Sequence, residues 1–411
     1  MKLEWKKLFV IGLAFFTISV AWGVYNSYVP VFLNRLIPSA TMVGAIMTID
    51  NVFGLLFQPY FGKKSDTTKT RFGRRMPYMI VGVPLAALFF ILIPGHVIGK
   101  GDILPLVLLM GSVIGMNFFM SVYRAPVVAM MPDATPQPLR AKANGIINFM
   151  GGLGSVAAFL VGGALFKQGE SLPFFFAAAL MLLALFVLMA AYKEPEVPYG
   201  SDDESVVSSS GAGLFLSKNG HPPLYKSNKP LIFLLFSIFF WFCGYNGVET
   251  FFTLYCAETF GMNEGSAAQL LTFMALSFLI FAIPAGLIGT KLGRGRTMRM
   301  GVLVMLLAFG FILLFGQANN LMYALVIAGF GWALININSY PSVASMAPPG
   351  ETGKYTGFYY AFSFSASIAS PILFGVIADL LGSKEYLFLY GCFMFGLAFI
   401  TLILATTKKK V

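Results

Sequence analysis

Long apolar runs, separated by short polar connections, dominate the chain. Each run holds about 20 or more mostly apolar residues, which is the length that an α-helix needs to cross a bilayer. The pattern predicts an all-α membrane protein with twelve transmembrane helices. Their expected bounds are 8–33, 41–62, 77–98, 103–131, 142–166, 172–192, 230–256, 266–290, 297–316, 320–346, 354–380 and 386–406. Several runs exceed the crossing length, which indicates tilted helices or helices that continue beyond the bilayer.

The composition agrees with this class. Hydrophobic residues make up 57% of the 411 residues, charged residues make up 11%, and the mean hydropathy is +0.78. An ordinary soluble domain carries about 25% charged residues, so a soluble globular protein is excluded. The net charge of +11 does not indicate nucleic-acid binding, because the basic residues lie in short loops and form no basic aromatic face.

Residues that commonly hold metals or perform catalysis are sparse in the sequence. Cys243, Cys256 and Cys392 fall in apolar runs without metal-ligand spacing. His96 lies at the end of a run and His221 lies in a polar stretch. The sequence shows no nucleophile–base set and no nucleotide-binding loop. We therefore expect no cofactor, no metal and no enzymatic activity.

Lysine and arginine are distributed unevenly between the two sides of the predicted helices. Of the 28 such residues, 23 lie on the side of the two termini, and Arg124 lies inside a run. The opposite side holds Arg35, Lys100, Lys167 and Lys384. This asymmetry predicts that both termini are cytoplasmic. We interpret the C-terminal lysines 408–410 as part of the same pattern rather than as a retrieval signal. The first run is too long for a cleavable signal peptide, and we expect none.

A polar stretch divides the predicted helices into two equal sets. Residues 193–228 are rich in serine, glycine and acidic side chains, and we expect a flexible cytoplasmic linker there. The expected domains are an N-terminal six-helix bundle over 1–192 and a C-terminal six-helix bundle over 229–411. Short motifs recur in the same order in both halves, for example Tyr25-Asn26 and Tyr245-Asn246, which predicts a parallel repeat.

The connection over residues 58–78 is unusually basic. Its single acid is Asp66, and its six cations are Lys63, Lys64, Lys69, Arg71, Arg74 and Arg75. One interpretation is that the loop has no role beyond that of an anchor that fixes the topology of the membrane helices. The glycines and the lone acid favour a more specific role.

This loop resembles one found in transporters of the major facilitator superfamily, and in particular in the sucrose–proton symporters and the related glycoside–cation symporters. The matching residues are Gln58-Pro59, Gly62, Ser65-Asp66, Arg71-Phe72-Gly73-Arg74-Arg75 and Pro77, with a second match at Arg124-Ala125 and Asp133. The resemblance implies two six-helix bundles that work by alternating access. It also implies a cytoplasmic gate network that stabilises the outward-open state, formed by Gly62, Asp66, Arg71, Gly73, Arg74, Arg75, Asp133 and Arg140.

Charged residues inside membrane spans are expensive and therefore candidates for function. Three stand out, namely Asp50, Arg124 and Glu249. Our hypothesis is that Arg124 binds substrate or a carboxylate partner, and that Asp50 or Glu249 carries the coupling ion. The alternative is that Asp50 and Arg124 form a buried structural pair that locks two helices together.

One position departs from the resembling family. Plant sucrose symporters carry an acidic residue eleven positions before the essential arginine, and Val113 occupies that position here, although Asn117 is retained. Coupling therefore uses another carboxylate, for which Asp50 is the best placed, or is absent. The oxygen ligands of Asp50 and Asn51 would also suit a sodium ion, so proton and sodium coupling both stay open.

In the resembling superfamily, the first, fourth, seventh and tenth helices line the substrate cavity. The candidates on these helices are Tyr25, Asn26, Tyr28, Asn117, Tyr123, Arg124, Trp241, Tyr245, Asn246, Asn336 and Asn338. Amides and hydroxyls suit the hydroxyl groups of a sugar, while Trp22, Trp241 and Trp332 can stack on its apolar faces. The alternative is that these polar side chains join helices to one another.

The expected function is import of a sugar or glycoside in symport with a proton or a sodium ion. Export of sugars or drugs by proton antiport is the second interpretation, and a receptor or scaffold that transports nothing is the third. We expect a monomer in the plasma membrane, with the lipid bilayer, a small-molecule substrate and a coupling cation as its partners and no nucleic acid.

Overall fold

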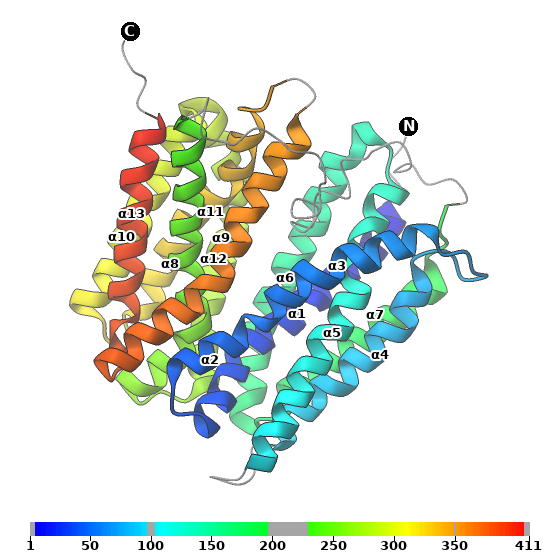
Figure 1. Cartoon of the computed structure of the whole chain (residues 1–411), viewed down its shortest axis with the longest axis horizontal. Coiled ribbons are helices and arrows are strands. Elements are labelled where there is room, and N and C mark those ends of the chain that lie inside the picture. Colours follow the sequence, from blue (N-terminus) through cyan, green and yellow to red (C-terminus); the bar gives the residue numbers. More distant parts are fainter. Residues whose placement is uncertain (1–4, 97–102, 196–228, 349–350, 407–411) are drawn as a thin grey trace. The chain divides into compact units, whose positions relative to one another are not determined.

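The computed structural model describes residues 5–96, 103–195, 229–348 and 351–406, and within these ranges the chain forms helices and turns without any strand (Figure 1). The α-helices are α1 (Trp5–Leu36), α2 (Ala40–Met47), α3 (Ile49–Thr67), α4 (Met76–Leu92), α5 (Ile103–Ala134), α6 (Arg140–Gln168), α7 (Leu172–Ala191), α8 (Lys229–Phe260), α9 (Glu264–Leu292), α10 (Arg294–Phe315), α11 (Leu321–Ala344), α12 (Thr352–Leu381) and α13 (Leu387–Thr406). The short 3₁₀ helices are η1 (Ile93–His96), η2 (Gln137–Leu139) and η6 (Lys384–Tyr386).

Twelve helical segments of the described chain are long and apolar enough to cross a membrane. This confirms the predicted all-α class and the predicted number of spans. The protein is therefore a multi-pass membrane protein. Of the predicted linker, residues 196–228 lie outside the described residues, and so do the C-terminal lysines 408–410.

The chain forms two compact units. The first unit holds Met1–Pro38, Ile49–Ser210 and Asn263–Thr272. The second unit holds Ser39–Thr48, Gly211–Met262 and Phe273–Val411. Two short segments, 39–48 and 263–272, therefore belong to the unit that is built mainly from the other half of the chain.

In the first unit, α1 packs against α6 and α7, α4 packs against α5 and α7, and α3 packs against α5. An aromatic core holds α1, α6 and α7 together. The rings of Tyr28 and Phe166 stack with their centroids 4.3 Å apart, and Phe32 and Phe174 stack at 5.7 Å. Helices in a bilayer associate largely through such close packing, because lipid tails are as apolar as the side chains.

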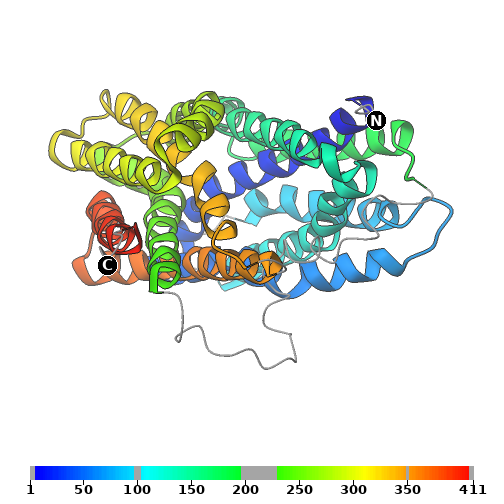
Figure 2. The same ribbon diagram turned by 90° about the horizontal axis from the view of Figure 1, so that it is seen from above.

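In the second unit, α8 packs against both α12 and α13, and α10 packs against α11 and α13. The turned view shows α13 beside α8 (Figure 2). The rings of Phe309, Phe388 and Phe395 form edge contacts with centroids 5.1 to 5.5 Å apart. The short helix α2 packs against α12 in this unit.

A reciprocal glycine contact joins α6 to the first turn of α9. A Cβ atom added to Gly163 would lie 2.5 Å from the carbonyl oxygen of Gly265, and one added to Gly265 would lie 2.6 Å from the carbonyl oxygen of Gly163. Real Cβ atoms do not approach other atoms this closely, so both positions require glycine. Beside this contact, Lys167 Nζ donates to Gln269 Oε1 at 2.6 Å.

The second predicted span is a single crossing made of two helices. α2 ends at Met47 and α3 begins at Ile49, with a turn at Thr48 between them. The Thr48 hydroxyl donates to the Ala45 carbonyl at 2.7 Å, and the Thr48 backbone N–H donates to the same oxygen at 3.2 Å. This local bonding replaces the regular pattern of an α-helix for one residue. No proline or glycine marks the site in the sequence, and the break places Asp50 in the first turn of α3.

Candidate functional site

A cluster of polar and aromatic side chains from α1, α3 and α5 lies inside the membrane spans of the first unit. The Asn117 amide donates to the Tyr25 hydroxyl at 3.1 Å, and both side chains are buried. The Arg124 guanidinium carbon lies 5.7 Å from the centre of the Trp22 ring, and the Trp22 ring contacts the Tyr25 ring edge-on at 5.4 Å. Asp50 interacts electrostatically with both Tyr25 and Arg124, which closes the cluster. We call these five residues the α1–α3–α5 cluster.

Asp50 owes its local geometry to the break at Thr48. Its Oδ1 atom accepts from the Asn51 backbone N–H at 2.6 Å and from the Asn51 side-chain amide at 2.7 Å. No direct ion pair joins Asp50 to Arg124 within the described part of the chain, although the two charges attract each other. The alternative of a buried structural Asp50–Arg124 pair that locks the two helices together stays a prediction, since the two charges attract each other without direct contact.

Two polar atoms of the α1–α3–α5 cluster have no hydrogen-bond partner among the described residues. They are Trp22 Nε1, which is a donor, and Asn117 Oδ1, which is an acceptor. An unpartnered polar group in an apolar environment costs about 1–3 kcal/mol. Together with the donors of Arg124 and the acceptors of Asp50, these atoms offer both donors and acceptors to a polar ligand.

Three further candidates of the N-terminal half occupy different surroundings. Tyr28 stacks on Phe166 in the aromatic core, and its side chain is buried. The Tyr123 hydroxyl donates to the sulfur of Met120 at 2.7 Å on the same helix. Asn26 is partly buried on α1, next to Tyr25 in sequence. The contacts of Tyr28 and Tyr123 are those of packing residues.

In the second unit, the candidate residues Tyr245 and Glu249 lie on α8. The Tyr245 ring stacks on Trp332 of α11, with centroids 4.1 Å apart and an interplanar angle of 10°. Glu249 interacts electrostatically with Tyr245. The Asn246 amide donates to the Phe242 carbonyl of its own helix at 2.7 Å. The middle of α8 thus carries a carboxylate, Glu249, and an aromatic ring, Tyr245, that stacks on a ring of α11.

The remaining candidates of the C-terminal half differ in exposure. Trp241 is fully buried, and its Nε1 atom has no partner among the described residues. The Asn338 amide donates to the Ala285 carbonyl of α9 at 3.1 Å and to the Leu334 carbonyl at 3.0 Å, so it joins α11 to α9 as the alternative interpretation expects. Asn336 is partly buried on α11.

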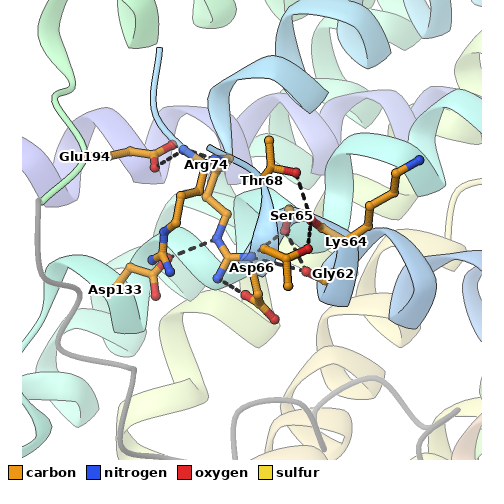
Figure 3. Close-up of polar contacts among 10 residues, drawn as sticks. Gly62, Lys64, Ser65, Asp66, Thr68, Arg74, Asp133 and Glu194 are labelled. Atoms are coloured by element: carbon orange, nitrogen blue, oxygen red, sulfur yellow. Dashed lines mark hydrogen bonds and ion pairs between the residues drawn. The ribbon is translucent and has the colours of Figure 1, made fainter. Parts of the chain in front are cut away.

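At the predicted cytoplasmic end of the first unit, two arginines connect several elements (Figure 3). Arg75 Nε and Arg74 Nη2 both donate to Asp133 Oδ2, at 3.0 Å and 3.1 Å. Arg75 also donates to the Ser65 hydroxyl and forms an ion pair with Asp66. The α3–α4 charge cluster, as we name it, consists of Gly62, Ser65, Asp66, Arg74, Arg75, Asp133 and Glu194.

Arg75 is the centre of this cluster and is 4% exposed. Burial alone would lower the pKa of its guanidinium, but the neighbouring Asp133 and Asp66 carboxylates outweigh burial and raise the pKa above its ordinary value. Arg75 therefore stays charged at every physiological pH. Its donors to the Gly62 carbonyl, at 3.3 Å, and to Ser65 tie the end of α3 to the start of α4.

Glu194 is the member of this cluster that the sequence analysis missed. Its carboxylate, just after α7, accepts the backbone N–H groups of Arg74, Arg75 and Met76 at 2.6, 2.7 and 3.0 Å. These are orphan donors at the N-terminus of α4, where a negative charge is also favoured by the helix dipole. A signal existed in the sequence, since Arg75-Met76-Pro77 opens a helix without a capping Ser, Thr, Asp or Asn.

The other predicted gate residues lie around the cluster. Gly73 has φ = 100°, in the left-handed region that glycine adopts without strain, and it allows the chain to turn toward Glu194. Arg71 is exposed and stacks over the Phe72 ring at 4.6 Å. Arg140 Nε donates to the Thr135 carbonyl at 3.3 Å. Asp133, expected in a loop, lies in the last turn of α5.

Replacing Glu194 with glutamine should destabilise the protein by about 1–2 kcal/mol, because the uncharged amide keeps one acceptor for three backbone donors. The melting temperature of the purified protein measures the effect. The matched control is Glu351→Gln, since Glu351 forms an exposed ion pair with Lys354 at 3.0 Å, which is worth little. Equal melting temperatures for Glu194→Gln and the wild type would contradict the capping role.

Comparisons with known proteins agree with this architecture. The sequence profile of the Major Facilitator Superfamily matches residues 11–371. The chain is 25% identical to the tetracycline resistance protein, class B, of Escherichia coli, over 86% of this chain and 84% of that protein. It is 22% identical to the isoprimeverose transporter of Lactiplantibacillus pentosus, over 77% of this chain and 65% of that protein. The solved structure of the nucleoside transporter NupG has a TM-score of 0.74 at 13% identity, covering 99% of this chain and 100% of that chain, and at this identity the likeness shows the fold alone.

Proposed function

Because the chain belongs to the major facilitator superfamily, we propose that it works by alternating access and imports a sugar or glycoside together with a coupling cation. Membership indicates a transporter with a small-molecule substrate rather than an enzyme. The substrate class, the direction and the coupling are the parts that we propose.

The observation that carries the proposal is the α1–α3–α5 cluster. It places one carboxylate and one guanidinium inside membrane spans, where a charge costs about 2.5–3.5 kcal/mol, without a direct ion pair between them. It also leaves Trp22 Nε1 and Asn117 Oδ1 without partners among the described residues. Polar atoms that find no partner among the described residues can be satisfied by a ligand with many hydroxyl groups, which would offset the cost of leaving them unpaired.

Aromatic rings support a sugar as the substrate class. Tyr245 and Trp332 in the second unit, and Trp22 in the first, carry aromatic rings of the kind that pack on the C–H faces of a pyranose. The likeness to the isoprimeverose transporter supports the same class.

For the coupling ion we propose Asp50, with Glu249 as the second candidate carboxylate. Asp50 and Arg124 attract each other electrostatically. This attraction is lost when the Asp50 carboxylate gains a proton and returns when it releases the proton. A proton is our preferred ion, and a sodium ion bound by Asp50 and Asn51 oxygens is the alternative. The α3–α4 charge cluster is proposed as the cytoplasmic gate, and the plasma membrane is proposed as the location because uptake from the medium takes place there.

Export is the second candidate function. The observation that favours it is the 25% identity with the tetracycline resistance protein, which extends over 86% of this chain. A proton antiporter would use the same membrane-embedded carboxylate and the opposite flux. The Asn117 amide and the Tyr25 hydroxyl of the α1–α3–α5 cluster fit a neutral, hydroxyl-rich substrate better than an apolar drug.

The experiment is a transport assay in proteoliposomes with a panel of radiolabelled mono- and disaccharides and with tetracycline. An imposed inward proton gradient should drive accumulation of at least one saccharide, and the same experiment with an inward sodium gradient separates the two ions. Saccharide accumulation driven only by an outward proton gradient, or proton-driven movement of tetracycline alone, would support export instead. Facilitated flux that no ion gradient alters would reject coupling.

A further inference from the structure

Four cations are gathered where α9 ends and α10 begins, at the predicted cytoplasmic end of the second unit. Lys291 lies in the last turn of α9, and Arg294, Arg296 and Arg299 lie at the start of α10. Lys291, Arg294 and Arg296 are exposed, and Arg299 is partly buried. We call these four residues the α9–α10 basic turn.

The protein does not neutralise this turn. Residues 265–350 contain no aspartate and no glutamate. The next acid along the chain, Glu351, forms an ion pair with Lys354 at 3.0 Å. All ion pairs within the described part of the chain use cations other than those of the α9–α10 basic turn. Its four positive charges therefore repel one another without a compensating carboxylate.

The matching turn of the first unit, between α3 and α4, is built differently. Its Arg75 pairs with Asp66 and Asp133, and its Arg74 pairs with Asp133. The distribution of cations between the two sides of a membrane requires basic residues in both turns, but it does not require that they lack acidic partners. The uncompensated charge is therefore a property of the α9–α10 basic turn itself.

Other helices of the second unit hold the backbone of this turn in place. Arg294 Nη1 donates to the Pro341 carbonyl of α11 at 2.9 Å. A Cβ atom added to Gly295 would lie 2.9 Å from a methyl carbon of Thr406 on α13, so the turn passes close to the end of that helix. Thr297, the next residue but one, is fully buried. The cations are thus carried by a fixed backbone, so a ligand that binds them loses less conformational entropy in ordering the chain.

An apolar stripe on α10 leads directly to the basic turn. Its members are exposed side chains spaced by three or four residues, namely Met300, Leu303, Leu307, Phe311 and Leu314. This spacing places them on one face of the helix. Exposed apolar side chains in a row along a membrane span are expected to face the lipid hydrocarbon. Arg296 and Arg299 precede Met300 and Leu303 by four residues each and therefore continue the same face.

A second apolar stripe, on α9, ends at the same turn. Its members within the second unit are Leu276, Ile280, Ile283 and Leu287, and all four are exposed. Ile283 is 77% exposed, so nearly its whole side chain lies outside the protein. Lys291 follows Leu287 by four residues and terminates this stripe. Both helices therefore present apolar side chains that give way to cations at the predicted cytoplasmic end.

We propose that the α9–α10 basic turn binds the headgroup of an anionic phospholipid, with the acyl chains along the apolar stripes that end there. A lipid phosphate supplies the negative charge that the turn lacks, and arginine donates well to phosphate oxygens. A lipid also matches both parts of the surface, because its charged headgroup and its hydrocarbon meet at the level where the cations end the stripes. The site is independent of the substrate that the protein transports.

The test is native mass spectrometry of the purified full-length protein in a neutral detergent, titrated with dioleoyl phosphatidylglycerol. Dioleoyl phosphatidylcholine has the same chains and no net charge, and it is the comparison lipid. Phosphatidylglycerol should bind at least about tenfold more tightly. The triple variant Lys291→Gln, Arg296→Gln and Arg299→Gln should lose most of this preference, because each basic residue near an anionic headgroup strengthens binding about fivefold. Arg294 is retained because it bonds to α11.

The matched control removes three exposed cations from the corresponding turn of the first unit, through Lys63→Gln, Lys64→Gln and Lys69→Gln. It lowers the net charge by the same amount and should leave the preference within about twofold of the wild type. An equal loss in both triple variants would overturn the proposal, because it would show a general attraction of lipid to basic residues. Equal binding of the two lipids by the wild type would overturn it as well.

Far-ultraviolet circular dichroism and gel filtration establish that each variant is folded. If the triple variant of the basic turn does not fold, the single variant Arg296→Gln should weaken phosphatidylglycerol binding about fivefold, and unchanged binding would reject the site. Soluble glycerol phosphate distinguishes a lipid site from a site for any phosphate, since it has no acyl chains. A tenfold excess over lipid should displace little phosphatidylglycerol, and complete displacement would overturn the assignment to a lipid.

Discussion

Replacing Arg124 with lysine should lower substrate uptake at least about a hundredfold, which corresponds to ~2.7 kcal/mol of transition-state stabilisation. The planar guanidinium lies over the Trp22 ring, with its carbon 5.7 Å from the ring centre, and its positive charge attracts the Asp50 carboxylate. Lysine keeps the charge, but it lacks the planar fork that stacks on a ring and donates to two ligand oxygens at once. The initial rate of saccharide uptake into proteoliposomes measures the loss.

The matched control for this substitution is Arg35→Lys. Arg35, at the end of α1, pairs with Glu170 at 2.7 Å and with Glu264 at 3.4 Å and is exposed. Such pairs contribute little to stability, and Arg35 lies outside the α1–α3–α5 cluster. Uptake by Arg35→Lys should stay within about twofold of the wild type. Comparable losses in the two variants would show that any arginine-to-lysine change harms the protein, and would remove the argument for Arg124.

Replacing Asp50 with asparagine should abolish ion-driven accumulation while leaving substrate exchange across the membrane largely intact. Asparagine has nearly the same shape and keeps the hydrogen-bonding oxygen, but it cannot gain or lose a proton, so the energy of the gradient no longer reaches the substrate. Two assays on the same vesicles measure the effect. Accumulation under an imposed gradient should fall at least about tenfold, and counterflow of labelled against unlabelled substrate should change by less than about threefold.

Two comparison variants make this result specific. Glu249→Gln tests the second candidate carboxylate and should retain accumulation if Asp50 carries the ion. Glu170→Gln removes a carboxylate that pairs with Arg35 outside the cluster and should have no effect on either assay. Full accumulation in Asp50→Asn, together with its loss in Glu249→Gln, would move the coupling site from the first unit to the second.

The fold was largely predictable because a bilayer permits few solutions. Every backbone polar group in the hydrocarbon must be satisfied within its own segment, so runs of about 20 apolar residues become helices regardless of detail. The run 41–62 shows where this argument stops. Hydropathy predicts one crossing and the structure has one crossing, but the break at Thr48 depends on a side-chain hydroxyl bonding to the Ala45 carbonyl, which hydropathy does not register.

The charged candidates could be selected from the sequence for a similar reason. A charge in a membrane span is rare enough to be noticed, and Asp50 and Arg124, once noticed, do lie near each other in the structure. Amides and phenols are less informative. Asn117 and Asn338 look alike in the sequence, yet Asn117 bonds to Tyr25 within the cluster while Asn338 bonds to a backbone carbonyl of α9. Only the packing of helices distinguishes the two environments.

Glu194 and Asp379 show what sequence patterns could not supply. Each binds backbone N–H groups at the start of a helix that is more than 100 residues away along the chain, with separations of 120 residues to Arg74 and 339 residues to Ala40. Local capping rules compare residues within one turn, so they do not register a cap that arrives from another helix. Both acids stand in ordinary surroundings in the sequence, one in a polar stretch and one near the end of an apolar run.

The reciprocal contact between Gly163 and Gly265 has a consequence for how the protein can vary. At each position a backbone carbonyl oxygen of the other glycine obstructs a side chain, and at Gly163 the Gln269 side chain obstructs it as well. When one residue of a packed pair becomes larger, a second mutation usually compensates by making its partner smaller. Here the partner is glycine, which is already the smallest residue, and its backbone oxygen cannot be removed by mutation. Neither site therefore has a second-site suppressor at the other, and a population that lost one glycine could recover only by reversion or by moving α6 away from α9.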